Sequence, residues 1–188
     1  MTEIFFVRHA EPNSKNHDEK NRELTPKGLA DRRLILDFFR ERALDAVFSS
    51  PYRRAMETIS PLARERGLEI RLDEDFRERR VGGWLEDFDT FARAQWADFS
   101  YRLPGGECLA EAQTRSLRAL RRILEEYPEK HVAVGCHGTA LCTVIHAFDP
   151  SFGYPGFAAM QGLMPWIVQF TFCGTECRRI QTYDLFAK

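Results

Sequence analysis

The sequence contains no apolar run that approaches the ~18 residues of a membrane-spanning helix. It also lacks the basic and apolar segments of a secretory signal peptide, because Met1 leads directly into the first predicted strand. We therefore expect a cytoplasmic protein that has no membrane partner.

The sequence also lacks an excess of charge of either sign. It contains 27 Lys and Arg residues and 28 Asp and Glu residues, which gives a formal net charge of −1. A protein that binds nucleic acid or an anionic membrane usually carries a basic excess. We expect no nucleic-acid partner. The composition leaves the oligomeric state open.

Paired cysteine and histidine motifs are missing as well. Five cysteines are an odd number without tight paired spacing, which argues against a disulfide framework and favours a reducing compartment. Neither a His-x-x-x-His nor a Cys-x-x-Cys pair occurs. The sequence therefore predicts no metal site and no cofactor.

Three short apolar runs are each followed by polar residues of types that can bind a phosphate group. They are followed by Arg8-His9, by Ser50 to Arg54 and by His137-Gly138. Unbroken runs of this kind are typical of parallel strands covered on both faces, and ligands bind beyond the carboxyl ends of such strands. The sequence therefore predicts a site where two histidines and at least two arginines meet, which suits a phosphate group.

Helical patterns alternate with the strands along the chain. We predict helices over 26–42, 51–66, 88–99, 109–127 and 141–148, and strands over 4–8, 46–49, 69–72, 131–136, 166–172 and 178–183. Pro61 should kink or restart its helix, and residues 149–162 should be irregular. This order predicts one domain over 1–188 in the α/β class, a three-layer α-β-α sandwich with a mainly parallel sheet.

Phosphoryl transfer depends on positioning and on charge stabilisation. Arg8 and Arg53 are the expected clamp, because a guanidinium offers two parallel donors to a phosphate. A neutral imidazole can attack phosphorus to form a phosphohistidine. His9 and His137 are the candidates for this nucleophile, and the acid that protonates the leaving oxygen could be Glu74, Glu78 or Glu86.

The run Arg8-His9-Ala10-Glu11 resembles the signature of the histidine phosphatase superfamily, in its phosphoglycerate mutase-like branch. Later motifs of that family follow in the same order between Ile4 and about Ile145: Leu24 to Gly28, Ser49 to Ala55 with Thr58, Phe76 to Glu78 followed by Gly82 and Trp84, Gly105 to Glu107, and His137-Gly138. The resemblance implies the phosphoglycerate mutase-like fold and a metal-independent phosphatase.

The resemblance also implies roles for single residues. His9 would be the nucleophile, Arg8 and Arg53 the phosphate ligands, and His137 a ligand that stabilises the transferring group. Glu78 would be the acid, because it falls where the acid of the family's loop lies, before a Gly and a Trp. Another branch takes its acid from an Asp after the second histidine, and Gly138 at that position strengthens the case for Glu78.

The sequence departs from the family pattern at two places, and the second of them bears on the substrate. Ala10 replaces the usual Gly, and the loop after Glu11 lacks the Trp-Asn element of the mutases. A phosphatase that acts on a small phosphomonoester is therefore favoured over a phosphoglycerate-type mutase. A protein that only binds a phosphorylated ligand is the third alternative.

Several other residues have competing interpretations. Cys173 and Arg179 have the Cys-x5-Arg spacing of cysteine-dependent phosphatases, although Arg179 lies in a predicted strand. We expect Arg54 to face solvent or a helix-surface carboxylate, His17 to be solvated, and His131 and His146 to be structural. Three arginines after Phe76 could recruit an acidic substrate or simply form a solvated loop: Arg77, Arg79 and Arg80.

Overall fold

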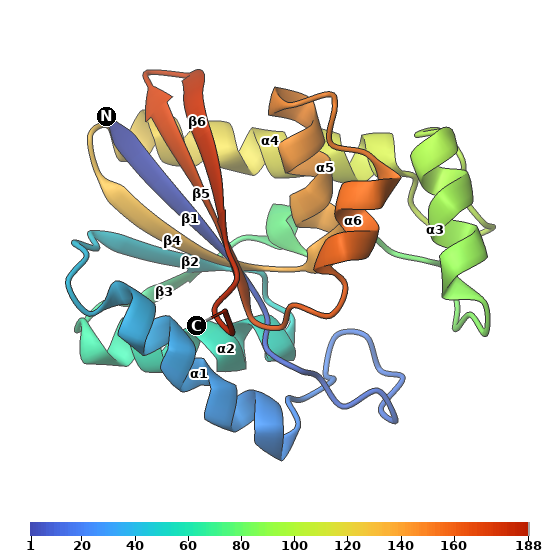
Figure 1. Ribbon diagram of the computed structural model, residues 1–188, viewed down its shortest axis with the longest axis horizontal. Helices are drawn as coiled ribbons and strands as arrows, with labels where there is room; N and C mark the ends of the chain where they lie inside the picture. The colour runs from blue at the N-terminus through green and yellow to red at the C-terminus, as the bar shows by residue number, and fades with distance from the viewer. Residues whose placement is uncertain (188) are drawn as a thin grey trace.

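The computed structural model describes residues 1–187, which form a six-stranded sheet in the order β3-β2-β4-β1-β5-β6 (Figure 1). β1 and β4, β2 and β4, and β2 and β3 pair in parallel, whereas β5 pairs antiparallel with both β1 and β6. The predicted α/β class and mainly parallel sheet are confirmed. The strands are β1 (Thr2–Arg8), β2 (Ala46–Ser49), β3 (Ile70–Leu72), β4 (His131–Cys136), β5 (Trp166–Cys173) and β6 (Glu176–Tyr183).

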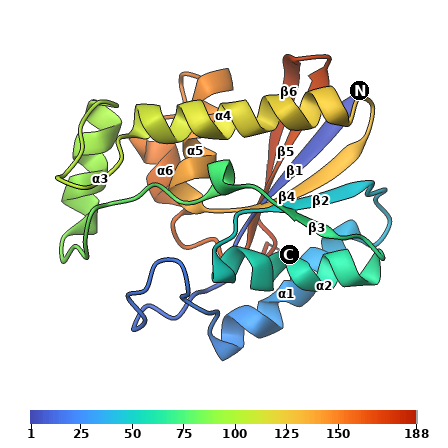
Figure 2. The ribbon, with the colours of Figure 1, turned by 180° about the vertical axis from the view of Figure 1, so that it is seen from behind.

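Helices cover both faces of the sheet, as the two opposite views show (Figures 1 and 2). One face carries α1 (Pro26–Phe39) and α2 (Arg53–Glu65), and the other carries α4 (Leu109–Glu126) and α5 (Gly138–Phe148). Two shorter helices lie beyond one end of the sheet, α3 (Phe88–Ala97) and α6 (Tyr154–Met160), and a 3₁₀ turn, η1, spans Glu74–Phe76.

The two cores follow from the alternation of side chains along a strand. In β1, Ile4 and Phe6 join the core shared with α4 and α5. Phe5 and Val7 point the other way, into the core shared with α1 and α2. Successive residues of a strand face opposite sides of its sheet, so an apolar run without polar interruption requires a helical layer on each side.

Helix α6 corrects the prediction that residues 149–162 are irregular. A proline in its first turn fixes a helical φ, and Phe157 and Met160, three residues apart, bury one face of the helix. With only seven residues, the helix shows too little of its period to stand out in the sequence.

Pro61 does not restart α2, which runs unbroken from Arg53 to Glu65. Proline has no N–H to donate to the carbonyl four residues earlier, which belongs to Glu57. In this structure Arg32 replaces that donor, because its Nη1 lies 3.1 Å from the Glu57 oxygen. The freed carbonyl is therefore satisfied from α1.

The strand register brings the predicted functional residues to one edge of the sheet. Arg8 pairs with Cys136, so the residues that follow, His9 and His137, leave neighbouring strands side by side. The His9 amide donates to the Cys136 carbonyl at 3.1 Å. The loop 11–24 and helix α3 lie at this same end of the sheet in both views (Figures 1 and 2).

Candidate active site

A pocket of about 750 Å³ opens at the carboxyl ends of β1 and β4. Three of the predicted site residues line it: Arg8, His9 and Glu78. His137 is fully buried beside His9, with the two ring centroids 5.3 Å apart. Neither of the other two candidate acids, Glu74 and Glu86, is among the lining residues.

His9 is held as a specific tautomer. Its Nδ1 lies 2.8 Å from the carbonyl oxygen of Ala10. Since a carbonyl only accepts, Nδ1 carries the proton and Nε2 keeps its lone pair. Burial, with the positive charges of Arg54 and Arg8, holds the pKa of His9 well below 6.5. The imidazole is therefore neutral and nucleophilic at Nε2 near neutral pH.

Ala10 is fixed in turn by α2, because its amide donates to the Thr58 hydroxyl at 3.0 Å. His137 is fixed by Ser50, the residue after β2, because its Nε2 lies 2.8 Å from Ser50 Oγ. Its Nδ1 is buried without a hydrogen-bond partner among residues 1–187. Burial and the charge of Arg54 hold the pKa of His137 well below 6.5.

Arg8 is anchored from the far end of the chain. Its Nη1 donates to the carbonyls of Met160, Gln161 and Leu163 at 2.7, 3.0 and 2.9 Å. Gly138 makes room for the guanidinium, since a Cβ there would lie 3.0 Å from the Arg8 Nε. Every residue has a backbone carbonyl, so the sequence could not show that these three bind Arg8.

The pocket contains Arg54 and not the predicted Arg53. The Arg53 side chain is 54% exposed and pairs with Glu57, one turn along the outer face of α2. Arg54 lines the pocket and is 2% exposed, and its carboxylate partner, Glu19, lies in the loop 11–24, so the expectation that it faces solvent or a helix-surface carboxylate was wrong. Helical spacing was the overlooked signal, because Arg54 shares its face with the buried Thr58 and Leu62.

The Glu78 carboxylate caps the start of α5. It accepts from the amides of Thr139 and Ala140 at 3.0 and 2.9 Å, and from that of Arg79 at 2.7 Å. A carboxylate at a helix N-terminus is stabilised by the unpaired amides and by the helix dipole. Because α5 follows directly after His137, this cap places Glu78 within the group of site residues.

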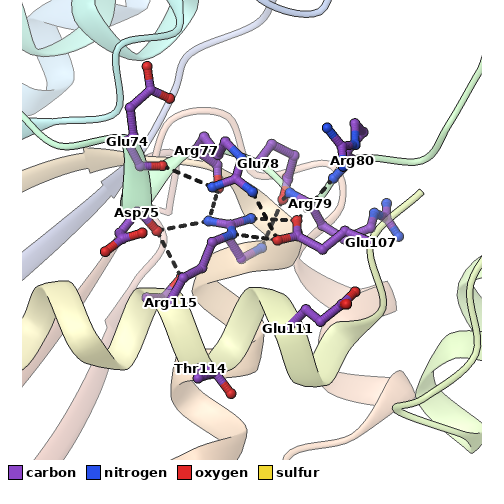
Figure 3. Close-up of polar contacts among 12 residues, drawn as sticks. Glu74, Asp75, Arg77, Glu78, Arg79, Arg80, Glu107, Glu111, Thr114 and Arg115 are labelled. Carbon is purple, nitrogen blue, oxygen red and sulfur yellow. Dashed lines mark hydrogen bonds and ion pairs between the residues drawn. The ribbon is translucent and has the colours of Figure 1, made fainter. Parts of the chain in front are cut away.

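A buried ion pair fixes the segment that carries Glu78 (Figure 3). Arg115 holds both oxygens of Glu107, at 2.7 and 2.8 Å, and donates to the carbonyls of Asp75 and Arg77 at 2.8 and 2.7 Å. Burial opposes ionisation of Glu107, but Arg115 and Arg77 outweigh it and lower the pKa of that carboxyl. The sequence motif included Glu107 but gave no sign of its partner on α4.

Glu19 ties the loop 11–24 to the pocket. Its carboxylate lies 2.7 Å from the Arg54 Nη2 and 2.6 Å from the Arg22 Nη2. His17 is exposed, as expected for a solvated loop histidine, and it also stacks on Trp84 with ring centroids 3.7 Å apart and lines the pocket. The long loop is therefore part of the pocket wall.

The remaining histidines and the exposed cysteine lie elsewhere. His131 contacts Asp45, and His146 Nδ1 lies 2.7 Å from the Phe152 carbonyl oxygen. Cys173 and Arg179 sit on the paired strands β5 and β6, outside the pocket lining, which contradicts the cysteine-phosphatase alternative.

Within the described residues, 1–187, no group of three or more His, Cys, Asp or Glu side chains is arranged to hold a metal ion. None of the helices in that range combines the length and the apolarity needed to cross a membrane.

The two buried histidines should make folding stability depend on pH. Their folded pKa lies below the ordinary 6.5, so between the two values the unfolded chain binds more protons. The contribution of these two neutral histidines to the free energy of unfolding is complete above about pH 6.5 and is lost as the pH falls below that value. We expect the free energy of unfolding, from urea titrations, to decrease between pH 7.5 and 5.5, and to decrease less in His9→Asn.

The matched control is His131→Asn, which removes a partly exposed histidine at the start of β4. A decrease in His9→Asn as steep as that of the wild type would contradict the assignment of His9 as a neutral buried imidazole.

Known proteins share both the sequence pattern and the fold. The chain is 28% identical over 158 residues to the uncharacterized phosphatase PhoE of Bacillus subtilis, covering 80% of each chain. A mycobacterial glucosyl-3-phosphoglycerate phosphatase complexed with VO3 superposes with a TM-score of 0.80 at 20% identity, covering 97% of this chain and 98% of that one. A mutant phosphoserine phosphatase of Entamoeba histolytica in complex with phosphoserine gives 0.77 at 19% identity, covering 96% of each.

A family model matches residues 4–156, a range that includes both buried histidines, Arg54 and Glu78. This match covers most of the chain and accounts for the order of the motifs in the sequence. The chain therefore belongs to the histidine phosphatase superfamily, branch 1.

Proposed function

We propose that this protein is a metal-independent phosphatase that hydrolyses a small phosphomonoester through a phosphohistidine at His9. The observation that carries the proposal is the His9 tautomer, because the hydrogen bond from Nδ1 to the Ala10 carbonyl leaves Nε2 unprotonated in the pocket. The relatives support the reaction class, since several of them are named as phosphatases.

In the first step, Nε2 attacks phosphorus. A P–N bond forms while the bond from phosphorus to the ester oxygen breaks. The leaving oxygen takes a proton from Glu78, whose carboxylate takes up that proton from water when the phosphate dianion binds beside it. In the second step, water attacks the phosphohistidine, the P–N bond breaks, and the water gives one proton back to Glu78. Each covalent step is easier than direct attack of water on the ester.

The phosphoryl oxygens carry the charge that develops in both steps. Arg8 and Arg54 bind them, and Arg54 takes the role that the sequence assigned to Arg53. His137 offers a ring nitrogen that has no other partner among residues 1–187. Each charge-assisted hydrogen bond contributes about 1.5–3 kcal/mol, so three such groups can supply a large part of the stabilisation of the transition state.

The reaction is tested with 4-nitrophenyl phosphate in the presence of EDTA, with release of inorganic phosphate as the readout. Turnover in EDTA supports a metal-independent hydrolase. A mutase would instead move phosphate within a sugar acid and release little of it to water. A protein that only binds phosphate would show vanadate binding without turnover of any phosphomonoester.

The role of Glu78 as the acid is tested by comparing substrates whose leaving groups differ in pKa. A phenol of low pKa leaves without a proton, whereas an alkyl alcohol needs one. We expect Glu78→Gln to lower kcat for alkyl phosphates by about 10²-fold or more, and for 4-nitrophenyl phosphate by less than about tenfold. Glu86→Gln, outside the pocket lining, is the matched control. An equal loss for both substrates would assign the acid to another group.

We also propose that residues 1–188 form one domain that works in the cytoplasm without a nucleic-acid or membrane partner. All five cysteines are free thiols, three of them buried, which fits a reducing compartment.

A further inference from the structure

A second cavity lies between α4 and the segment 75–80, which also carries Glu78 (Figure 3). Its volume is about 540 Å³, and its lining includes none of the residues that take part in the proposed reaction. Arg80 lines both this cavity and the catalytic pocket. The two spaces are therefore neighbours that present different groups to a ligand.

Arginine is the dominant residue type around the second cavity. Five arginines line it, against three carboxylates, and the difference is two positive charges. The chain as a whole has a formal net charge of −1, so this excess is local. Like charges around one cavity repel each other, and an anion between them removes that cost. The arginines are Arg77, Arg80, Arg102, Arg115 and Arg118, and the carboxylates are Asp75, Glu107 and Glu111.

The ion pairs show where the excess arises. Glu107 is shared by two arginines, with Arg115 Nε at 2.7 Å and Arg77 Nη2 at 3.1 Å. Arg80 forms no ion pair with a carboxylate within residues 1–187. The excess therefore comes from Arg80 and from the sharing of Glu107. The other two arginines each have a carboxylate of their own, Arg102 with Glu111 at 2.6 Å and Arg118 with Asp75 at 2.7 Å.

The arginines at the rim of the second cavity are accessible from solvent. The side chains of Arg102 and Arg118 are 54% and 61% exposed, and Arg80 is exposed as well. They belong to three different segments, so a ligand in the cavity can be bound from several sides. Ala110, in the first turn of α4, also lines the cavity, and the positive end of a helix dipole favours an anion.

We propose that this cavity is a second anion site, which binds a phosphate-type dianion separately from the catalytic pocket. A phosphate carries up to two negative charges near neutral pH, which offset the excess of two positive charges. Its tetrahedral oxygens can accept from guanidinium groups on several sides at once. A single carboxylate would leave half of the excess uncompensated. The phosphate is either the free ion or part of a small organic compound.

The test counts bound phosphate by equilibrium dialysis with radiolabelled inorganic phosphate, at low ionic strength because salt screens exposed arginines. The variant of the second site is Arg102→Gln/Arg118→Gln. The matched control is Arg33→Gln/Arg121→Gln, which also removes two exposed arginines but lies outside both linings. His9→Ala/Arg54→Gln removes the catalytic pocket as a binding site.

We expect two phosphate ions per chain in the wild type and in the matched control. Arg102→Gln/Arg118→Gln should weaken the second site by about tenfold or more, so that one ion remains. That ion should be the catalytic one, so phosphate should inhibit 4-nitrophenyl phosphate hydrolysis with a constant within about twofold of the wild type. His9→Ala/Arg54→Gln should retain only the second site.

The source of the phosphate is read in His9→Ala/Arg54→Gln, where glycerol 3-phosphate competes with the labelled ion. Displacement by glycerol 3-phosphate at a lower concentration than unlabelled phosphate assigns the site to organic phosphates, and the reverse order assigns it to the free ion. Arg102→Lys/Arg118→Lys keeps the charges that hold Asp75 and Glu111 but loses the planar forks, so its affinity should be intermediate.

One phosphate ion per chain in the wild type would overturn the proposal. Retention of two ions in Arg102→Gln/Arg118→Gln would also do so, and so would an equal loss in the matched control, which would show an effect of net charge alone. Failure of the proposed function is a separate result, in which the wild type does not hydrolyse 4-nitrophenyl phosphate. The count of bound ions does not depend on turnover.

Discussion

His9→Ala should lower kcat for 4-nitrophenyl phosphate by about 10⁴-fold or more, because the variant has no group that can form the covalent intermediate. The neighbouring His137 cannot take its place, since its Nε2 is held by Ser50 and its Nδ1 binds a phosphoryl oxygen in the proposed mechanism. The measurement is the release of inorganic phosphate, together with mass spectrometry after an alkaline quench, which should show a phosphoryl group on the wild-type peptide that contains His9.

His131→Ala is the control for this variant, since His131 lies at the opposite end of β4 from His137. It should retain wild-type turnover and wild-type labelling. Phosphorylation of any other residue, or turnover in His9→Ala within tenfold of the wild type, would transfer the role of nucleophile away from His9.

Arg54→Lys should lower kcat/KM by about 10- to 100-fold, whereas Arg53→Lys should change it by less than about twofold. The two arginines are adjacent in sequence but face different surroundings, because Arg54 lines the pocket and Arg53 pairs with Glu57 on the outside of α2. Lysine keeps the charge and loses the planar fork that binds two phosphate oxygens. Initial rates and inhibition by inorganic phosphate measure the effect.

Each of these two substitutions is the matched control for the other. Thermal unfolding of both variants separates a loss of activity from a loss of folding. If Arg53→Lys were the damaging variant, phosphate binding would belong to Arg53, as the sequence motif suggested.

The mainly parallel sheet was predictable because strands that are buried on both faces have sequences without polar interruptions. Ile4 to Val7 contains no polar residue, and each alternate side chain enters a different core. The elements that the sequence did not reveal are short, such as α6. Their positions depend on contacts with distant segments more than on their own periodicity.

The candidate site was predictable where the functional group is a side chain at the end of a strand, as with Arg8, His9 and His137. It was not predictable where the functional group is a backbone carbonyl, as at Met160, because every residue has one. The choice between Arg53 and Arg54 could be predicted only in part. Their motif does not distinguish them, but the helical period does, because Arg54 falls on the face of α2 that carries Thr58.

The pairing of β1 with both β4 and β5 has a consequence for biosynthesis. β1, which leads into His9, is the first of the six strands to be synthesised, yet its two neighbours begin at His131 and Trp166. Arg8 must also wait for the carbonyls of Met160 to Leu163. A nascent or truncated chain that ends before these residues has no assembled site, so catalytic activity reports that synthesis and folding have passed β5.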